Sequence, residues 1–272
     1  MPELPEVETT RRGIEPHVTG ATVREVIVRR GDLRQAVSAS LVGITGMHIT
    51  GVRRRAKYIL LDIADGSCVL MHLGMSGSLR VVAPSAEWKK HDHVGITLDK
   101  RHQLRLHDPR RFGLVLHLTE HEPLSHPLLR DLGPEPLEAG FSAPYLKNAC
   151  ARRSIAIKLA IMDSHVVVGV GNIYASEALF QAGIRPLTTA RHLSLPRLEK
   201  LVTAIRVVLT KSIAAGGTTL RDFLRSDGQP GYFKQNLHVY GRTGETCHVC
   251  GTTIRHTVLG QRATYWCQQC QR

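Results

Sequence analysis

The sequence predicts an α+β protein in which a strand-rich half, a helical part and a small cysteine-bearing segment follow one another. Three observations support this prediction. From about Ala21 to Leu118, short runs rich in β-branched and apolar residues alternate with turns. Across residues 198–213, apolar residues recur at helical spacing. Near the C-terminus, four cysteines stand in two C-x2-C pairs.

The chain opens with a predicted helix over residues 5–14. Pro5 suits the first helical turn, and we expect Pro16 to end the helix. The Glu residues near its start suit the positive end of the helix dipole. The residues at helical spacing are Val7, Thr10, Arg11 and Ile14.

The strand-rich half contains two predicted hairpins. Residues 22–28 are rich in β-branched side chains. Residues 57–63 and 68–73 flank the turn Ala64-Asp65-Gly66-Ser67, and residues 93–98 and 104–106 flank a second turn. These patterns predict a sandwich or a barrel.

Proline and glycine cluster over residues 123–140, which we interpret as a domain junction. Beyond it, residues 163–183 predict two helices around the turn 169–172, and Gly216-Gly217 follows the apolar helix. We therefore expect domains at 1–130, 131–235 and 236–272. The apolar face of the long helix comprises Leu198, Leu201, Val202, Ile205, Val208, Leu209 and Ile213.

Charge points to a polyanionic partner. The 272 residues carry a formal net charge of +13, and 42% of them are hydrophobic, which is enough for a sizeable core. Nucleic acid or an anionic membrane surface would satisfy that charge, and a merely basic or ribosome-associated protein is the alternative. Because no apolar run approaches about 18 residues and the N-terminus lacks the apolar stretch of a signal peptide, we expect a cytoplasmic protein.

The paired cysteines predict a structural zinc site. Sixteen residues separate the two C-x2-C pairs, and four thiolates close a tetrahedral site around one Zn²⁺. Two disulfides or four unrelated thiols are the alternatives, which a cytoplasmic location disfavours. Arg262, between the pairs, could bind phosphate or be a solvated side chain. The predicted ligands are Cys247, Cys250, Cys267 and Cys270, and Cys68 and Cys150 are expected to be packing residues.

The N-terminus offers a candidate nucleophile. Met1 precedes a small residue, a position at which processing commonly removes methionine, and Pro2 would then carry a free secondary amine. An α-amino group has a reference pKa of about 7.7–8.0, so a neutral fraction exists near neutral pH. Such an amine can form an iminium Schiff base with an electrophilic carbon. The alternative is an ordinary helix start.

With these motifs in place, the whole chain resembles the bacterial formamidopyrimidine-DNA glycosylases. The resemblance implies an N-terminal β-sandwich, a helix–two-turns–helix domain and a zinc-finger hairpin. It also implies excision of oxidised purines, chiefly 8-oxoguanine and formamidopyrimidines, from duplex DNA, followed by β- and δ-elimination. The motifs are PELPEVE at 2–8, RRAKY at 54–58, HLGMSGSLR at 72–80, KHDHV at 90–94, DPRRFG at 108–113, LGPEPL at 132–137, VVGVGNIYASEALF at 167–180, GGTTLRDF at 216–223, SDGQPGYF at 226–233, VYGR at 239–242 and QRATYWC at 261–267.

The resemblance also implies catalytic roles. Pro2 matches the nucleophile that attacks C1′, and Glu3 matches the acid that assists opening of the sugar ring. Glu6 follows at i+3, so it can face the same pocket. Lys57 matches the proton donor of β-elimination, and Arg262 matches the finger residue of δ-elimination.

Further matches imply how DNA is held. The predicted DNA contacts are His91, Arg110, Arg153, Lys158 and Asn172. Met75, Arg110 and Phe112 match residues that fill the gap left by a flipped base, although core packing is the alternative for Met75 and Phe112. The loop over residues 216–233 would close over the flipped purine.

Two other functions stay open at this point. One is a related endonuclease VIII-like enzyme for oxidised pyrimidines, which the PELPEVE and DPRRF motifs and the 216–233 loop disfavour. The other is a non-catalytic zinc-bearing DNA-binding protein, which has no use for Pro2, Glu3 or Lys57. We expect a monomer that acts on double-stranded DNA and has no membrane partner.

Overall fold

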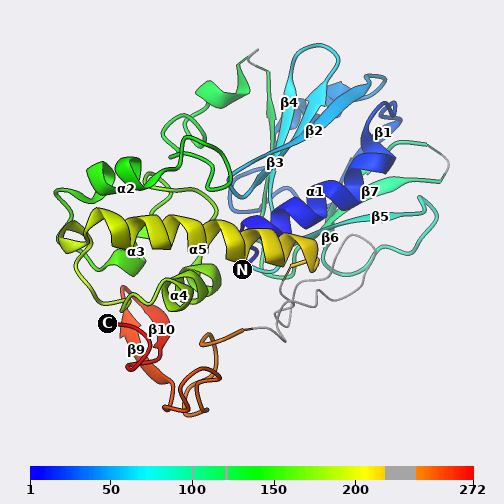
Figure 1. Cartoon of the computed structure of the whole chain (residues 1–272). Helices are drawn as coiled ribbons and strands as arrows, with labels where there is room; N and C mark the ends of the chain where they lie inside the picture. The colour runs from blue at the N-terminus through cyan, green and yellow to red at the C-terminus, as the bar shows by residue number, and fades with distance from the viewer. Residues whose placement is uncertain (100, 120–121, 218–236) are drawn as a thin grey trace. The chain divides into compact units, whose positions relative to one another are not determined.

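The structure is a computed structural model that describes residues 1–99, 101–119, 122–217 and 237–272. The chain forms two compact units. The first contains Met1–Arg130, and the described residues 215–217 belong with it. The second contains Asp131–Ala214 and the C-terminal part of the chain. Figure 1 shows the elements of both units.

Helix α1 spans Leu4–Val18 and begins with a reciprocal cap. The Glu6 carboxylate accepts a hydrogen bond of 2.9 Å from the Glu3 backbone N–H. The prediction that Pro16 ends the helix is wrong, because the helix continues through it to Val18. A proline so close to a C-terminus removes one hydrogen bond of the final turn only, and Thr19 N–H still donates to Glu15 O at 3.0 Å.

Two antiparallel four-stranded sheets form the rest of the first unit. One sheet has the order β1-β6-β7-β5, and the other has the order β2-β3-β4-β8. Both predicted hairpins are present, as β3 paired with β4 and β6 paired with β7. The strands are β1 Glu25–Val28, β2 Ile49–Arg55, β3 Tyr58–Ile63, β4 Cys68–His72, β5 Ser78–Val82, β6 Asp92–Thr97, β7 Gln103–His107 and β8 Leu114–Leu118.

One apolar core joins the two sheets, which settles the choice between sandwich and barrel in favour of a sandwich. Leu61 and Met71 of one sheet belong to the same buried cluster as Ile96 and Leu106 of the other. Val7 and Ile14 of α1 also belong to that cluster, and α1 contacts β2 and β5, one strand from each sheet. The core therefore fixes the head of α1 against the sandwich (Figure 1).

The second unit is helical, as predicted. However, the first of the two helices predicted over residues 163–183 lies earlier in the chain, as α3. Asp163 caps the C-terminus of α3 and does not begin a helix, so residues 163–171 form the turns before α4. The buried run Val166-Val167-Val168 lies in these turns. A short apolar run is compatible with either a buried turn or a helix, so the sequence pattern could not distinguish the two. The helices are α2 Ala143–Cys150, α3 Ile157–Met162, α4 Asn172–Gln181 and α5 Leu195–Ala214, and 3₁₀ turns occupy Ala39–Ile44, Pro123–Ser125 and Ala190–His192.

Helix α5 buries the face that its sequence predicted. All seven apolar residues of the predicted stripe are buried, and α5 contacts both α2 and α4. Between α4 and α5, the Tyr174 hydroxyl lies 2.6 Å from Ser212 Oγ, which satisfies both groups inside the core.

The C-terminal segment is a two-stranded hairpin, β9 Arg255–Leu259 and β10 Arg262–Trp266. Its small core contains Val239, Ile254 and the cysteines Cys247 and Cys267, packed against Phe180 of α4. The Glu177 carboxylate, also on α4, accepts hydrogen bonds from the backbone N–H groups of residues 238–240 at 2.8–2.9 Å. This polar contact fixes the segment that leads into the hairpin.

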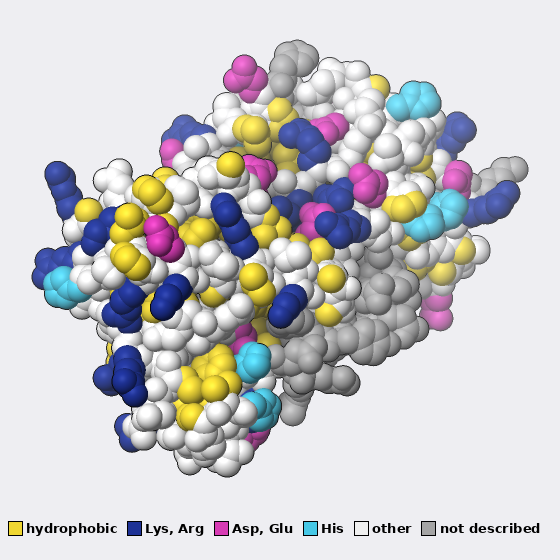
Figure 2. Space-filling model, in the orientation of Figure 1, with side chains coloured by type: hydrophobic (Ala, Val, Ile, Leu, Met, Phe, Trp, Pro, Cys, Tyr) yellow, Lys and Arg dark blue, Asp and Glu magenta, His cyan; other side chains and the backbone are white. Residues whose placement is uncertain are grey.

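Within the described part of the chain, no helix has the length and apolar character to span a bilayer. On the face shown in Figure 2, Lys and Arg side chains are spread over the surface with acidic side chains between them.

Candidate functional site

The head of α1 places two buried carboxyl groups directly after Pro2. Pro2 is buried, and Glu3 and Glu6 are each only 3% exposed. Gly217 lies close by, since a Cβ added there would be 3.2 Å from Glu6 Oε1. The backbone of Gly217 has φ +83°, a left-handed conformation that favours glycine. As the i+3 spacing predicted, Glu6 shares the environment of the N-terminal residues.

Lys57 lies at the tip of the β2–β3 hairpin. The turn has two residues, and Ala56 adopts a left-handed conformation with φ 55°. Arg54 supports this turn because its guanidinium donates to Ala56 O at 3.0 Å and pairs with Glu8 of α1 at 3.1 Å. Burial alone would raise the pKa of Glu8, but hydrogen bonds from Arg11 and Arg12 outweigh it and lower that pKa. Glu8 therefore stays ionised and links the hairpin to α1.

His72 is a nearby group that the sequence did not single out. Burial lowers its pKa to about 4, and the positive charges of Lys57 and Arg34 add to the effect. Gly74 N–H donates to its Nδ1 at 2.9 Å, which leaves the proton of the neutral ring on Nε2. The neutral His72 ring near Lys57 can therefore donate a hydrogen bond from Nε2 without adding a positive charge to the site. Only the fold could reveal it, because His72 ends β4 without any distinctive spacing.

The loops that carry Met75 and Phe112 pack directly against each other. A Cβ added to Gly74 would meet the Phe112 carbonyl carbon at 2.4 Å, so this contact needs glycine. The fully buried Asp108 carboxylate accepts hydrogen bonds from Gly113 N–H at 2.7 Å and Arg110 N–H at 3.3 Å. We call residues 108–113 the wedge loop.

The tip of the wedge loop is exposed. Phe112 is 44% exposed, and the Arg110 guanidinium lies 5.2 Å from the centre of its ring. Met75 is half-buried. An aromatic ring held at the surface by a rigid backbone is available to a partner, unlike a core side chain. His91 lies beside the base of this loop, where its carbonyl accepts from Asp108 N–H at 2.9 Å. The structure thus groups His91, Arg110, Phe112 and the Met75 loop.

The remaining predicted DNA contacts lie in the second unit. Arg153 is half-buried and pairs with Asp163 at 2.7 Å. Asn172 begins α4, and its Nδ2 donates to Ala263 O at 3.0 Å. Its Oδ1 is buried without a hydrogen-bond partner in the described structure.

Lys158, another predicted DNA contact, is fully buried in the second unit. Its side chain is 0% exposed, and its ammonium donates to Ala263 O at 2.9 Å and Thr264 Oγ1 at 2.8 Å. These two hydrogen bonds use two of the three donors of the ammonium. The contacts link Lys158 of α3 to Ala263 and Thr264, which follow Arg262 in β10, and its role as a DNA contact stays a prediction. The sequence could not show this, because burial of a lysine is rare and depends on tertiary contacts.

The four C-terminal cysteines form the predicted zinc site. Their sulfur atoms all lie within 4.8 Å of one another, with Cys247–Cys270 at 3.9 Å and Cys250–Cys267 at 3.4 Å. A tetrahedral ion with Zn–S bonds of about 2.3 Å places its sulfurs about 3.8 Å apart, so the cluster fits Zn²⁺. Four thiolates close the coordination shell, so the ion is structural and supplies folding energy to this small segment.

Arg262 stands at the start of β10, after the tight turn Gly260-Gln261. Both turn residues have positive φ, 52° and 60°. The side chain of Arg262 is exposed, and no ion-pair partner for it is found in the described part of the chain. Arg262 is therefore a cation presented at a hairpin tip.

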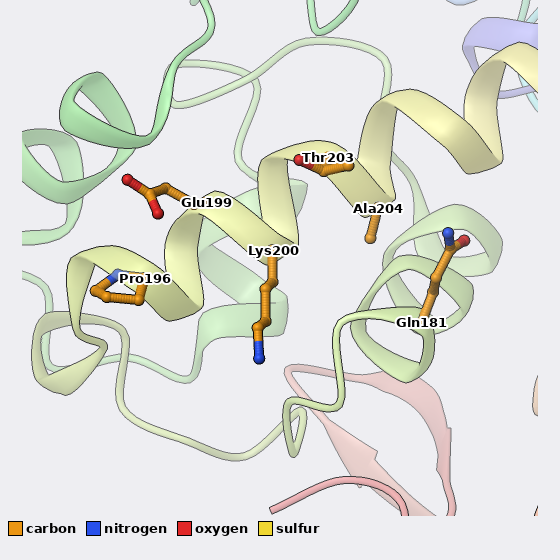
Figure 3. Close-up of a pocket in the computed structure, with 6 residues that line it drawn as sticks. All are labelled: Gln181, Pro196, Glu199, Lys200, Thr203 and Ala204. Atoms are coloured by element: carbon orange, nitrogen blue, oxygen red, sulfur yellow. The ribbon is translucent and has the colours of Figure 1, made fainter.

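Two further features do not add site residues. The loop over residues 216–233 lies outside the described residues except for Gly216 and Gly217. A hollow of about 410 Å³ on the second unit (Figure 3) is lined by none of the predicted residues. It is bounded by Gln181, Pro196, Glu199, Lys200, Thr203 and Ala204.

The first unit is thus a sandwich with buried acidic groups at its N-terminal helix, and the second is a helical unit with a four-cysteine hairpin. Three family models match the chain in order. They are the formamidopyrimidine-DNA glycosylase N-terminal domain over residues 1–115, the H2TH domain of the same glycosylase over 132–224, and the zinc finger found in FPG and IleRS over 244–272. The chain belongs to the formamidopyrimidine-DNA glycosylase family.

Relatives match over the whole chain. The formamidopyrimidine-DNA glycosylase of Thioalkalivibrio sulfidiphilus is 58% identical over 100% of both chains, and that of Klebsiella pneumoniae is 53% identical over 100% of both. Among solved structures, the Thermus thermophilus MutM protein superposes with a TM-score of 0.89 at 37% identity, covering 99% of this chain and 98% of that one. A Lactococcus lactis enzyme bound to Fapy-dG-containing DNA superposes with a TM-score of 0.92 at 31% identity over 100% of both. This protein is accordingly a DNA-binding glycosylase.

Proposed function

We propose that this glycosylase removes oxidised purines from duplex DNA and then cuts the strand at the resulting site, with Pro2 as the nucleophile. The observation that carries the proposal is the head of α1, where Pro2 precedes two buried carboxyl groups that share one environment. Buried acids next to an amine suit proton transfer during attack on a sugar carbon.

In the first stage, the Pro2 amine of a chain without Met1 attacks C1′ of the damaged nucleotide. The bond from C1′ to the base breaks, and the base departs with a proton. The amine loses its own proton and forms an iminium linkage as the sugar ring opens. Glu3 delivers the proton to the ring oxygen, and Glu6 holds the Glu3 backbone in place through its 2.9 Å hydrogen bond.

Two eliminations follow from the iminium. Loss of a C2′ proton expels the 3′ phosphate, and Lys57 supplies a proton to the departing group. A second elimination removes a C4′ proton and expels the 5′ phosphate, whose charge Arg262 stabilises. Water then hydrolyses the iminium, which releases the sugar remnant and frees the Pro2 amine. A guanidinium stays protonated, so Arg262 acts by holding phosphate more than by giving a proton.

Other residues hold and open the duplex. His91, Arg110, Arg153 and Asn172 bind the DNA backbone or the unpaired base, and Met75 and Phe112 fill the gap left by the flipped base. Lys158 and the zinc act indirectly by fixing β10. We further propose that the chain works as a monomer in the cytoplasm, with domain boundaries after residues 130 and 235.

The test compares duplexes that carry 8-oxoguanine, a formamidopyrimidine or an oxidised pyrimidine. Base release and strand cutting should be fastest on the two purine lesions, and both ends of the gap should carry phosphate. Preference for the oxidised pyrimidine, or binding of all three without cutting, would contradict the proposal.

A further inference from the structure

A row of polar side chains runs along the outer face of β7. Leu104 and Leu106 point into the sandwich core, so the alternation of a strand places Gln103, Arg105 and His107 on the opposite face. Arg105 is buried beneath Trp88, with its guanidinium 4.1 Å from the ring centre. His107 is the last residue of the row, and its side chain keeps 24% exposure.

A buried carboxylate anchors His107 from one side. Asp92 of β6 has a fully buried side chain, and its Oδ1 lies 2.8 Å from Nδ1 of His107. Burial alone would raise the pKa of Asp92, but hydrogen bonds from His107, the Lys89 backbone N–H and Arg80 outweigh it and lower that pKa. A carboxylate only accepts hydrogen bonds, so Nδ1 of His107 carries the proton.

The other ring nitrogen, Nε2, is left for a ligand. Among the described residues, no hydrogen bond to Nε2 of His107 is found, and the ring of His91 lies 5.9 Å away at an edge-on angle. The next residues in the chain, 108–113, are the wedge loop. His107 therefore stands between a predicted DNA contact and the loop that carries Arg110 and Phe112.

We propose that His107 is a further DNA-phosphate contact, beside His91, and that it takes up a proton when DNA binds. This inference rests on the proposed function, because it takes the surface at His91 to face DNA. A phosphate needs a donor at Nε2, and the imidazole offers one there only in its protonated form, since Nδ1 holds the proton of the neutral ring.

The charges around His107 give the sign of the pH effect. Burial lowers the pKa of His107, and the hydrogen bond with Asp92 opposes it without restoring the ordinary value. The free protein thus holds His107 neutral near pH 7, and a bound phosphate raises the pKa. Because the pKa of His107 is higher in the complex, binding of DNA is coupled to uptake of a proton. The affinity for DNA should therefore rise as pH falls, by up to about tenfold per pH unit for one linked proton. The groups that face His107 are Asp92, His91 and Arg80, and Arg105 lies 3.7 Å from the Asp92 carboxylate.

The experiment measures affinity of the full chain for a duplex with a tetrahydrofuran abasic-site analogue between pH 6 and 8.5. His107→Asn keeps a donor towards Asp92 but removes Nε2 and the titration. His102→Asn is the matched control, because His102 also pairs with a carboxylate, Asp99 at 3.0 Å, and lies beside the other end of β7.

We expect His107→Asn to weaken binding by about three- to tenfold at pH 6 and little at pH 8.5. At pH 6, it should also flatten the slope of log K against log salt by about 0.9. The control should change neither quantity. An unchanged pH profile, or an equal loss at every pH, would overturn the proposal. Borohydride trapping at saturating DNA reports on the proposed function separately, since His107→Asn should still form the covalent adduct.

Discussion

Two regions of this protein present an arginine at the tip of a turn, and they hold it by different forces. The wedge loop presents Arg110 beside Arg111 at φ 58°, and the zinc hairpin presents Arg262 after Gln261 at φ 60°. Asp108 clamps the wedge loop, which extends from a sandwich with a large apolar core. The hairpin has a small core, four thiolates and the Lys158 ammonium.

The two turns differ in the size of the apolar core beneath them. The Asp108 hydrogen bonds hold the wedge loop on a unit that a large apolar core stabilises. The hairpin instead depends on a metal and one buried cation, each of which a single substitution can remove. Single substitutions outside the loops should therefore disturb the position of Arg262 more than that of Arg110.

Removing one zinc ligand should have the largest effect. Structural zinc contributes about 10–16 kcal/mol to the folding of such segments, so Cys247→Ser should leave well under one zinc per chain. Amide exchange should then rise across residues 244–272 but not in β3 or β4. Metal analysis and hydrogen exchange give the two readouts. Cys150→Ala, which removes a buried cysteine outside the cluster, should keep the zinc. Full metal content in Cys247→Ser would contradict the assignment.

Lys158→Met should have an intermediate effect that is confined to the hairpin. Loss of the hydrogen bonds to Ala263 and Thr264 should cost about 1–3 kcal/mol locally and speed amide exchange across β9 and β10. Lys147→Met is the matched control, because Lys147 donates to Leu193 O at 2.6 Å in the same unit without touching the hairpin.

A double-mutant cycle connects Lys158 to Arg262. Arg262→Ala should flatten the salt dependence of DNA binding by about 0.9. If Lys158 works through Arg262, the combined variant should lose less affinity than the two single losses together. Strictly additive losses would show that Lys158 acts elsewhere. Arg262→Lys should recover little, because an ammonium lacks the two-pronged geometry of the guanidinium.

Phe112→Ala should have the smallest effect on stability. Its ring is exposed, so the free energy of unfolding should change by no more than about 0.5 kcal/mol. Phe141→Ala, which truncates a fully buried ring, should cost about 3–5 kcal/mol. A fluorescent base opposite the lesion should report weaker unstacking with Phe112→Ala. A large fall in melting temperature for Phe112→Ala would instead mean that the ring is part of the core.

The sequence predicted what depends on short-range patterns. The two hairpins, the apolar face of α5 and the cysteine cluster follow from alternation, helical period and ligand spacing. The i+3 relation between Glu3 and Glu6 also predicted a local contact that the helix cap realises. These features need no knowledge of distant parts of the chain.

What the sequence missed depends on tertiary contacts. The buried ammonium of Lys158 has partners 105 and 106 positions away, and His72 owes its depressed pKa to burial and to Lys57 and Arg34. The predicted position of the helix before α4 is also wrong, because a buried valine run has the same sequence pattern in a turn and in a helix. No local pattern encodes any of these environments.

Trapping the covalent intermediate tests directly whether Pro2 is the nucleophile. The purified chain, with loss of Met1 confirmed by intact mass, is reacted with 8-oxoguanine DNA in the presence of borohydride, and the adduct is mapped by peptide mass. Pro2→Glu, which should retain Met1 and so lack the free proline amine, is compared with Pro5→Ala, which keeps it. We expect one adduct at Pro2 in the wild type and in Pro5→Ala, and none in Pro2→Glu. An adduct on a lysine, or normal yield from Pro2→Glu, would contradict it.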